Sequence, residues 1–164
     1  MNETERVARQ LLHNRGVDIE DIAEIVLFLQ SEYIAGLTID ECIENVNRVL
    51  DKREVQHAIL TGIQLDMLAE QKQLIDPIQS IIASDEGLYG IDEIIALSIV
   101  NVYGSIGFTS YGYVDKLKPG IMKKLNEHKN GEVHTFLDDI VGAIAAAASS
   151  RLAHTSAKDR IEEQ

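Results

Sequence analysis

Four polar clusters lie in the second half of this 164-residue sequence, within segments that are otherwise apolar or rich in glycine. They are Asp85-Glu86, Asp92-Glu93, Asp115-x-x-Lys118-Pro119 and Asp138-Asp139. Carboxylates directed from different helices into one bundle could bind a hard divalent cation, because Mg²⁺ takes oxygen ligands and keeps waters that phosphate oxygens can replace. Lys116 and Lys118 add positive charge beside Asp115, which could hold the remaining charge of a phosphate.

The same acids have a structural alternative. Asp92-Glu93 and Asp138-Asp139 both fall in the first turn of predicted helices, where acids stabilise the helix dipole by roughly 0.3–1 kcal/mol. Asp85-Glu86 is interpreted as a solvated loop pair and Lys123-Lys124 as a solvated face. Spacing alone therefore leaves a metal site and plain helix capping equally open.

A cysteine-based phosphatase fits the sequence poorly. Cys42 and Arg48 have the spacing Cys-x5-Arg, but the residues between them have a helical pattern and lack the glycines of a phosphate loop. A thiolate nucleophile also needs electropositive surroundings, whereas Glu41 and Glu44 flank this cysteine. We expect Cys42 to have no catalytic role.

Nucleotide-loop and histidine-metal motifs are missing as well. Gly104-x-x-Gly107 is not followed by Gly-Lys-Ser/Thr, so we interpret it as a turn or a close helix contact. His57, His134 and His154 have no ligand spacing such as His-Glu-x-x-His, and we expect surface or satisfied polar roles for them.

Helical patterns run through the chain and must position these residues. The sequence has only two prolines, and apolar residues recur at spacings of three and four. Asp18 is a candidate helix cap, and Thr38 with Glu41 forms a capping box. The predicted helices cover residues 3–14, 19–33, 39–50, 53–71, 78–83, 91–103, 119–127 and 136–157.

These patterns predict an all-α, single-domain, multi-helix bundle with an apolar central helix. We expect the 91–103 helix to be buried on most sides, and the alanines of the last helix to let another helix approach closely. Residues 1–84 would form a helical N-terminal half, 85–157 the half with the polar clusters, and 158–164 a charged, frayed tail.

The net charge of the chain disfavours some classes of binding partner. The chain carries 15 basic and 27 acidic residues, a formal charge of −12, which disfavours nucleic acid, including helix-turn-helix binding by residues 1–84. The sequence starts without the basic and apolar segments of a secretory signal and has no apolar run of the about 20 residues that span a membrane. With one cysteine, it fits a reducing cytoplasm, with at most peripheral contact at the inner membrane face.

Three segments resemble the phosphatidylglycerophosphatase A family. Residues 90–95 contain an Asp-Glu at a helix start, 111–121 contain an Asp followed three residues later by Lys-Pro, and 136–143 contain an Asp-Asp before a small-residue helix. The family has these three motifs in the same order. The wider match, including the first half, is to a Gram-positive branch related to low-temperature-requirement C proteins. Where the family's membrane-bound members have Phe-Arg before the second Asp, this chain has Tyr111-Gly112.

This resemblance implies a Mg²⁺-dependent phosphatase that hydrolyses phosphatidylglycerophosphate to phosphatidylglycerol and phosphate. The metal-binding or catalytic carboxylates it implies are Asp92, Glu93, Asp115, Asp138 and Asp139. The lysines on the phosphate would be Lys116 and Lys118. The alternative is a non-catalytic helical binding or regulatory protein that retains the family fold. The small-residue final helix also predicts a homo-oligomer.

Overall fold

Nine α-helices and one short 3-10 helix make up the regular structure in residues 1–127 and 130–162, the part of the chain that the computed structural model describes. Their bounds are α1 Glu3–Asn14, α2 Ile19–Gln30, α3 Ile39–Leu50, α4 Arg53–Glu70, α5 Ile78–Ala83, α6 Ile91–Val100, η1 Asn101–Tyr103, α7 Ser105–Leu117, α8 Ile121–Asn126 and α9 Leu137–Glu162. These ranges contain no strand, so the predicted all-α bundle is confirmed.

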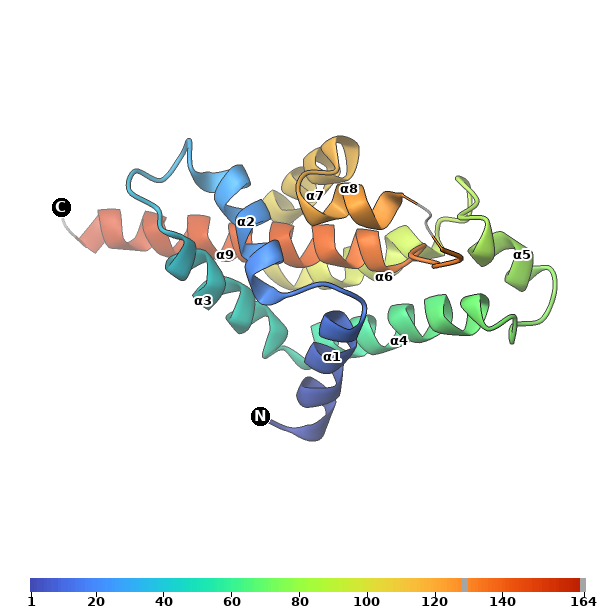
Figure 1. Cartoon of the computed structure of the whole chain (residues 1–164). Coiled ribbons are helices and arrows are strands. Elements are labelled where there is room, and N and C mark those ends of the chain that lie inside the picture. Colours follow the sequence, from blue (N-terminus) through green and yellow to red (C-terminus); the bar gives the residue numbers. More distant parts are fainter. Residues whose placement is uncertain (128–129, 163–164) are drawn as a thin grey trace.

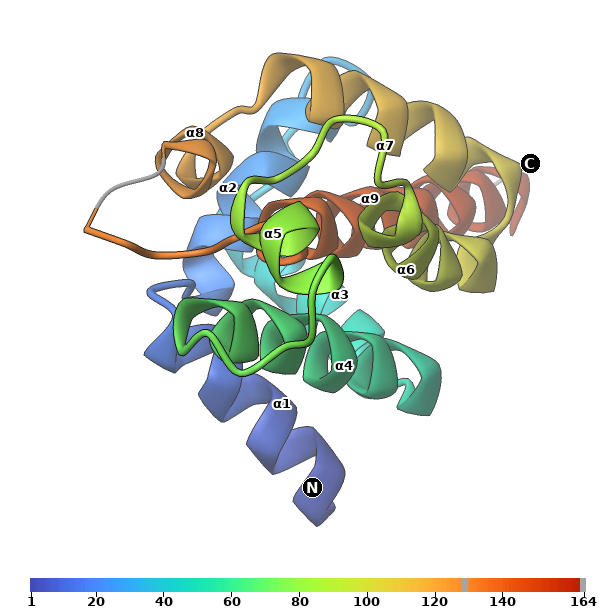
Figure 2. The same cartoon turned by 90° about the vertical axis from the view of Figure 1, so that its right-hand side faces the viewer.

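The last helix, α9, is the axis of the bundle. Figures 1 and 2 show it running through the middle of the molecule, with α4 and α7 on opposite sides of it. It contacts α2, α3, α4, α6, α7 and α8, and every residue from 133 to 150 is buried. The run Ala145–Ala148 lets these helices lie close to α9. At Gly62 of α4, an added Cβ would collide with the end of the Ile140 side chain of α9, so glycine allows this approach without a shift of that side chain.

Side-chain caps begin several of the surrounding helices. Asn2 accepts a hydrogen bond from the Glu5 N–H at the start of α1. At the start of α3, Thr38 accepts from the Glu41 N–H, and the Glu41 carboxylate accepts from the Thr38 N–H, which confirms the capping box. Such caps satisfy N–H groups that have no partner within the helix, and they explain why these starts were predictable.

The expectation for residues 91–103 is wrong in two respects. The α-helix ends at Val100, and its Ile91 and Ile94 are exposed, so α6 is only half-buried. The apolar central helix of the bundle is α9, whose middle is mostly alanine. Small residues bury a helix on all sides without large apolar side chains, and hydrophobicity alone therefore pointed to the wrong segment.

The helix α7 was not predicted, because its sequence is rich in glycine and in residues of low helix propensity. Packing stabilises it instead. Its buried residues Gly107, Tyr111 and Val114 recur at helical spacing, and α7 packs along α9. Gly107 lies where an added Cβ would come within 2.9 Å of Val100, so it serves the close helix contact that was expected.

Two further helix ends differ from the prediction by at least three residues. The second helix stops at Gln30 instead of continuing to Tyr33. The last helix continues to Glu162, past the predicted end near Ala157, because residues 155–162 contain no glycine or proline to stop it. The end of the predicted frayed tail, residues 163–164, lies outside the described residues.

Candidate active site

Three helix ends bring the predicted acids together. Asp92 lies in the first turn of α6, Asp138 and Asp139 lie in the first turn of α9, and Asp115 lies near the end of α7. Both α6 and α7 pack along α9, so the start of α6 and the end of α7 meet beside the start of α9 (Figure 2). We call these four carboxylates, together with Lys118, the site cluster.

Lys118 is the cation at the centre of the site cluster. Its Nζ lies 2.6 Å from Asp115 Oδ1, 3.1 Å from Asp138 Oδ2 and 3.9 Å from Asp139 Oδ1. The backbone of Lys118 is left-handed, with φ of 49°, where it ends α7 and turns the chain into Pro119. This conformation directs the side chain back to the bundle, so that one ammonium contacts acids from α7 and α9.

The acids of the site cluster outnumber its positive charge. Asp138 and Asp139 are each only 5% exposed and Asp92 is 8% exposed. Burial, together with the charges of Asp138 and Asp92, raises the pKa of Asp139. Burial also raises the pKa of Asp138, although Lys118 opposes that rise. Burial alone would lower the pKa of Lys118, but Asp138 and Asp115 outweigh it and raise that pKa. The cluster thus holds a surplus of buried carboxylates, as expected where additional positive charge is to be bound.

Tyr111 is a polar residue of this region that sequence reasoning missed. Its hydroxyl is buried and makes no hydrogen bond within the described part of the chain. Burial, and then the charges of Asp139 and Asp115, raise the pKa of this phenol, so it stays protonated and can donate. Tyr111 lies four residues before Asp115, and on a helix this spacing places both residues on one side. The sequence would have indicated this if α7 had been predicted.

The remaining predicted site residues are more peripheral. Glu93 and Lys116 are both exposed. Asp85, interpreted from the sequence as a solvated loop residue, is half-buried, and its charge raises the pKa of Asp138. It therefore belongs beside the site cluster, whereas its neighbour Glu86 is exposed, as expected.

The oxygen-only donor set of the site cluster suits a hard cation such as Mg²⁺. Its surplus of buried negative charge and the unpaired hydroxyl of Tyr111 agree with that chemistry. With Lys118 between the carboxylates, however, no three His, Cys, Asp or Glu side chains in residues 1–127 and 130–162 are arranged to hold a metal ion. The carboxylates of the site cluster are suitable ligands for Mg²⁺, but the ammonium group of Lys118 lies between them in this structure.

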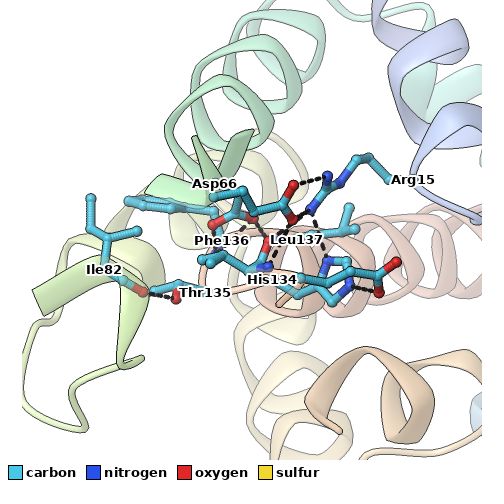
Figure 3. Close-up of polar contacts among 10 residues, drawn as sticks. Arg15, Asp66, Ile82, His134, Thr135, Phe136 and Leu137 are labelled. Carbon is cyan, nitrogen blue, oxygen red and sulfur yellow. Dashed lines mark hydrogen bonds and ion pairs between the residues drawn. The ribbon is translucent and has the colours of Figure 1, made fainter. Parts of the chain in front are cut away.

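A second polar group lies on the other side of the start of α9, and Figure 3 shows it. Asp66 of α4 is fully buried, and its carboxylate accepts hydrogen bonds from the Phe136 N–H at 3.0 Å and the Leu137 N–H at 3.0 Å. Thr135 donates its hydroxyl to the Ile82 carbonyl at 2.6 Å. These contacts hold the residues immediately before Asp138, so they set where the first turn of α9 begins.

Arg15 completes this second group. Its guanidinium donates to both carboxylate oxygens of Glu70 and to the Val133 carbonyl, and the Val133 N–H donates to Glu70. His134 is buried beside Arg15 and contacts Glu132 at 2.9 Å. Burial raises the pKa of Asp66 to about 8, against the effect of its two N–H donors. We call Asp66, Glu70, Arg15 and His134 the anchor cluster.

The cysteine and the histidines for which we expected no catalytic or metal-binding role lie in positions that agree with this expectation. Cys42 is fully buried in α3, and burial raises the pKa of its thiol to about 11, which excludes a thiolate nucleophile there. His57 and His154 are exposed, and His134 is the satisfied polar histidine just described. None of the helices in the described residues is both long and apolar enough to cross a bilayer.

Comparisons with known proteins agree with the motifs. The family model described as phosphatidylglycerophosphatase A matches residues 14–154. The uncharacterized protein YutG of Bacillus subtilis (strain 168) is 66% identical over 153 residues, covering 93% of this chain and 92% of YutG. The crystal structure of the low temperature requirement C protein from Listeria monocytogenes has a TM-score of 0.93 and 67% identity, covering 94% of this chain and 98% of the other. A protein of unknown function from Bacillus stearothermophilus has a TM-score of 0.92 and 69% identity, covering 94% and 96%.

Proposed function

The chain belongs to the phosphatidylglycerophosphatase A family, and from this membership we propose that it is a Mg²⁺-dependent lipid phosphatase that converts phosphatidylglycerophosphate to phosphatidylglycerol and phosphate. The observation that carries the proposal is the site cluster itself. Acids of the second and third family motifs meet around a single lysine, and Asp92 of the first motif lies close enough to raise the pKa of Asp139.

In this proposal Asp92, Glu93, Asp115, Asp138 and Asp139 provide the carboxylates that hold Mg²⁺. When bound, the cation would offset their charge and polarise the phosphoryl group. Lys118 then exchanges its contacts with Asp115 and Asp138 for the substrate phosphate, and Lys116 contributes charge at the rim.

Tyr111 supplies a proton donor beside these groups. Its buried hydroxyl has no acceptor in the described structure, and burial, reinforced by the surrounding acids, keeps it protonated. A phosphate oxygen brought to the site cluster would be an acceptor for it. Gly112 stands where the membrane-bound members have the arginine of the Phe-Arg pair, so Lys118 of the shared Lys-Pro motif is left without that second cation.

One observation favours the non-catalytic alternative. The ammonium of Lys118 already pairs with Asp115 and Asp138, which is a satisfied arrangement without any metal. A binding or regulatory protein that retains the family fold would keep this lysine bridge as a structural contact. The two functions differ in whether the protein releases phosphate when Mg²⁺ is supplied.

The deciding experiment measures phosphate release from phosphatidylglycerophosphate in mixed micelles, with Mg²⁺ and then with excess EDTA. The enzyme hypothesis predicts release that EDTA abolishes and that Asp92→Asn removes, with the helical circular dichroism unchanged. Absence of release by folded protein supplied with Mg²⁺, from this lipid and from soluble phosphomonoesters, would instead support the binding protein.

A further inference from the structure

The outward sides of α6 and α7 are apolar although they face solvent. On α7, Ile106, Thr109, Tyr113 and Leu117 are all exposed and follow one another at helical spacings of three and four. On α6, Ile91 and Ile94 are exposed in the same way, with Ile94 at 60%. The two helices pack side by side on α9 and are joined through η1, so their outer sides form one surface, which we call the α6–α7 face.

Charge is distributed unevenly between this face and the rest of the chain. Residues 94–114 contain no charged side chain, although 26% of the whole chain is charged. From residue 91 to residue 126, the end of α8, there are four lysines and three acids, a net charge of +1, while the remainder of the chain carries −13. The three acids are Asp92, Glu93 and Asp115, which all belong to the proposed metal site.

Lysines follow the apolar residues along the chain. Lys116 is exposed on α7 next to Leu117, whereas Lys123 and Lys124 are exposed on α8, the next helix. Tyr113 stacks on Phe28 of α2, with ring centroids 6.3 Å apart and an interplanar angle of 7°, which extends the aromatic surface. A cavity of about 370 Å³ opens beside these two rings, lined also by Tyr33 and Glu32. Exposed apolar and aromatic side chains bordered by lysines are typical of surfaces that enter the headgroup layer of an anionic membrane.

We propose that the α6–α7 face docks on an anionic phospholipid surface and so delivers the site cluster to a lipid phosphate. The proposal rests on the proposed function, since the face matters to catalysis only if the substrate is a membrane lipid. It is supported by continuity: the charge-free segment 94–114 begins directly after Asp92-Glu93 and ends directly before Asp115. The parts of the face closest to the site are therefore the ends of the same two helices.

This surface also accounts for a lipid substrate on an acidic protein. A uniform charge of −12 would repel anionic lipids, but the repulsion acts over about 8–10 Å at physiological salt. Because residues 94–114 carry no charged side chain, the repulsion is weakest in the orientation that places α6 and α7 against the lipid. Burial of the exposed isoleucines then supplies affinity.

The test is co-sedimentation with two kinds of vesicle, one of phosphatidylcholine alone and one of equal parts phosphatidylglycerol and phosphatidylcholine. We expect the wild-type protein to bind the anionic vesicles, and high salt to weaken that binding. The double variant Ile94→Glu with Ile106→Glu should bind them at least about tenfold less tightly, because two apolar contacts become anionic. The matched control is Ile75→Glu, since Ile75 is 81% exposed and lies between α4 and α5.

A second readout separates docking from catalysis. Phosphate release is measured on phosphatidylglycerophosphate in anionic vesicles and on a short-chain form dispersed as monomers. We expect the double variant to lose at least about tenfold on vesicles and to match the wild type on the monomers. If the wild type binds vesicles through this face but releases phosphate from neither substrate, the proposed function fails while the docking surface stands.

Three results would overturn the docking proposal. The first is a folded wild-type protein that binds neither kind of vesicle. The second is a double variant that binds anionic vesicles as tightly as Ile75→Glu does. The third is a wild-type oligomer, measured by light scattering, that the double variant dissociates without any change in vesicle binding, because the face would then join copies of this chain.

Discussion

Two groups of carboxylates flank the first turn of α9, and they are satisfied in different ways. In the anchor cluster, Asp66 has two backbone N–H donors, and Glu70 has Arg15 and the Val133 N–H. In the site cluster, Asp115, Asp138 and Asp139 share Lys118, and Asp92 adds a further buried carboxylate near Asp139. Buried carboxylates that are each hydrogen-bonded stabilise a fold, whereas buried carboxylates that lack enough partners indicate a binding site. The contrast assigns the anchor cluster to structure and the site cluster to function.

The largest difference should come from Asp139→Asn. We expect phosphate release to fall by about 10³-fold, since one of the proposed metal-binding carboxyl groups is lost. The unfolding free energy should be equal to or higher than that of the wild type, because the variant removes a carboxylate that Asp138 and Asp92 repel. Kinetics and urea denaturation on one preparation measure both. A variant that is active, or inactive only because it is unfolded, would contradict the assignment.

For Asp66→Ala we expect the reverse of Asp139→Asn, which is a loss of stability. Removing this carboxylate leaves the Phe136 and Leu137 N–H groups buried without an acceptor, which should cost about 3 kcal/mol of unfolding free energy. Thermal denaturation would show it as a fall in Tm of roughly 6–12 °C. Asp66→Asn keeps an acceptor oxygen and is the matched control, with a smaller loss. Equal losses in the two variants would show that hydrogen bonding to α9 is not what Asp66 contributes.

A smaller effect is expected for Arg15→Gln. The variant removes the cation from a half-buried pair with Glu70 and should cost about 2 kcal/mol in urea denaturation. Arg53→Gln, at the exposed start of α4, is the control. Phosphate release by the folded Arg15 variant should stay within about threefold of the wild type, corresponding to less than about 1 kcal/mol. A selective loss of turnover would place the anchor cluster in catalysis and remove the contrast between the two groups.

Asp66 should also make the stability of the protein depend on pH. Its pKa of about 8 in the folded protein lies above the ordinary value of 3.8, so the folded state binds the extra proton between these values. Stability from this group is therefore complete below about pH 4 and is lost as the pH rises towards 8. The groups acting on Asp66 are Arg15, which opposes the shift, and Asp138, which adds to it. We expect the unfolding free energy to fall from pH 5 to pH 8, and the fall to be smaller in Asp66→Asn.

The predictable parts of this molecule are those with local signals. Caps such as Thr38 and Glu41 located α3, and the regular apolar spacing located α2 and α4 to within a few residues at their ends. The helix α7 had no such signal, because its stability comes from packing against α9. Because α7 was not predicted, the sequence did not show that Tyr111 and Asp115 lie on the same side of one helix.

The site was only partly accessible to sequence reasoning for the same reason. The motifs identified the acids, but spacing could not distinguish a binding site from helix capping, and the structure shows that the acids occupy first turns and also converge. Asp66 carried no signal, since its partners are backbone groups 70 and 71 residues further along the chain. Contacts over such separations depend on the complete fold.

The central position of α9 has a consequence for how the chain folds during synthesis. The axis of the bundle is made last, so α2, α3, α6 and α7 leave the ribosome before the surface on which they pack exists. Their apolar sides stay exposed until residues 133–150 have emerged. A chain that stops before this segment lacks the shared core of all these helices, and such an intermediate is the kind that aggregates or recruits chaperones.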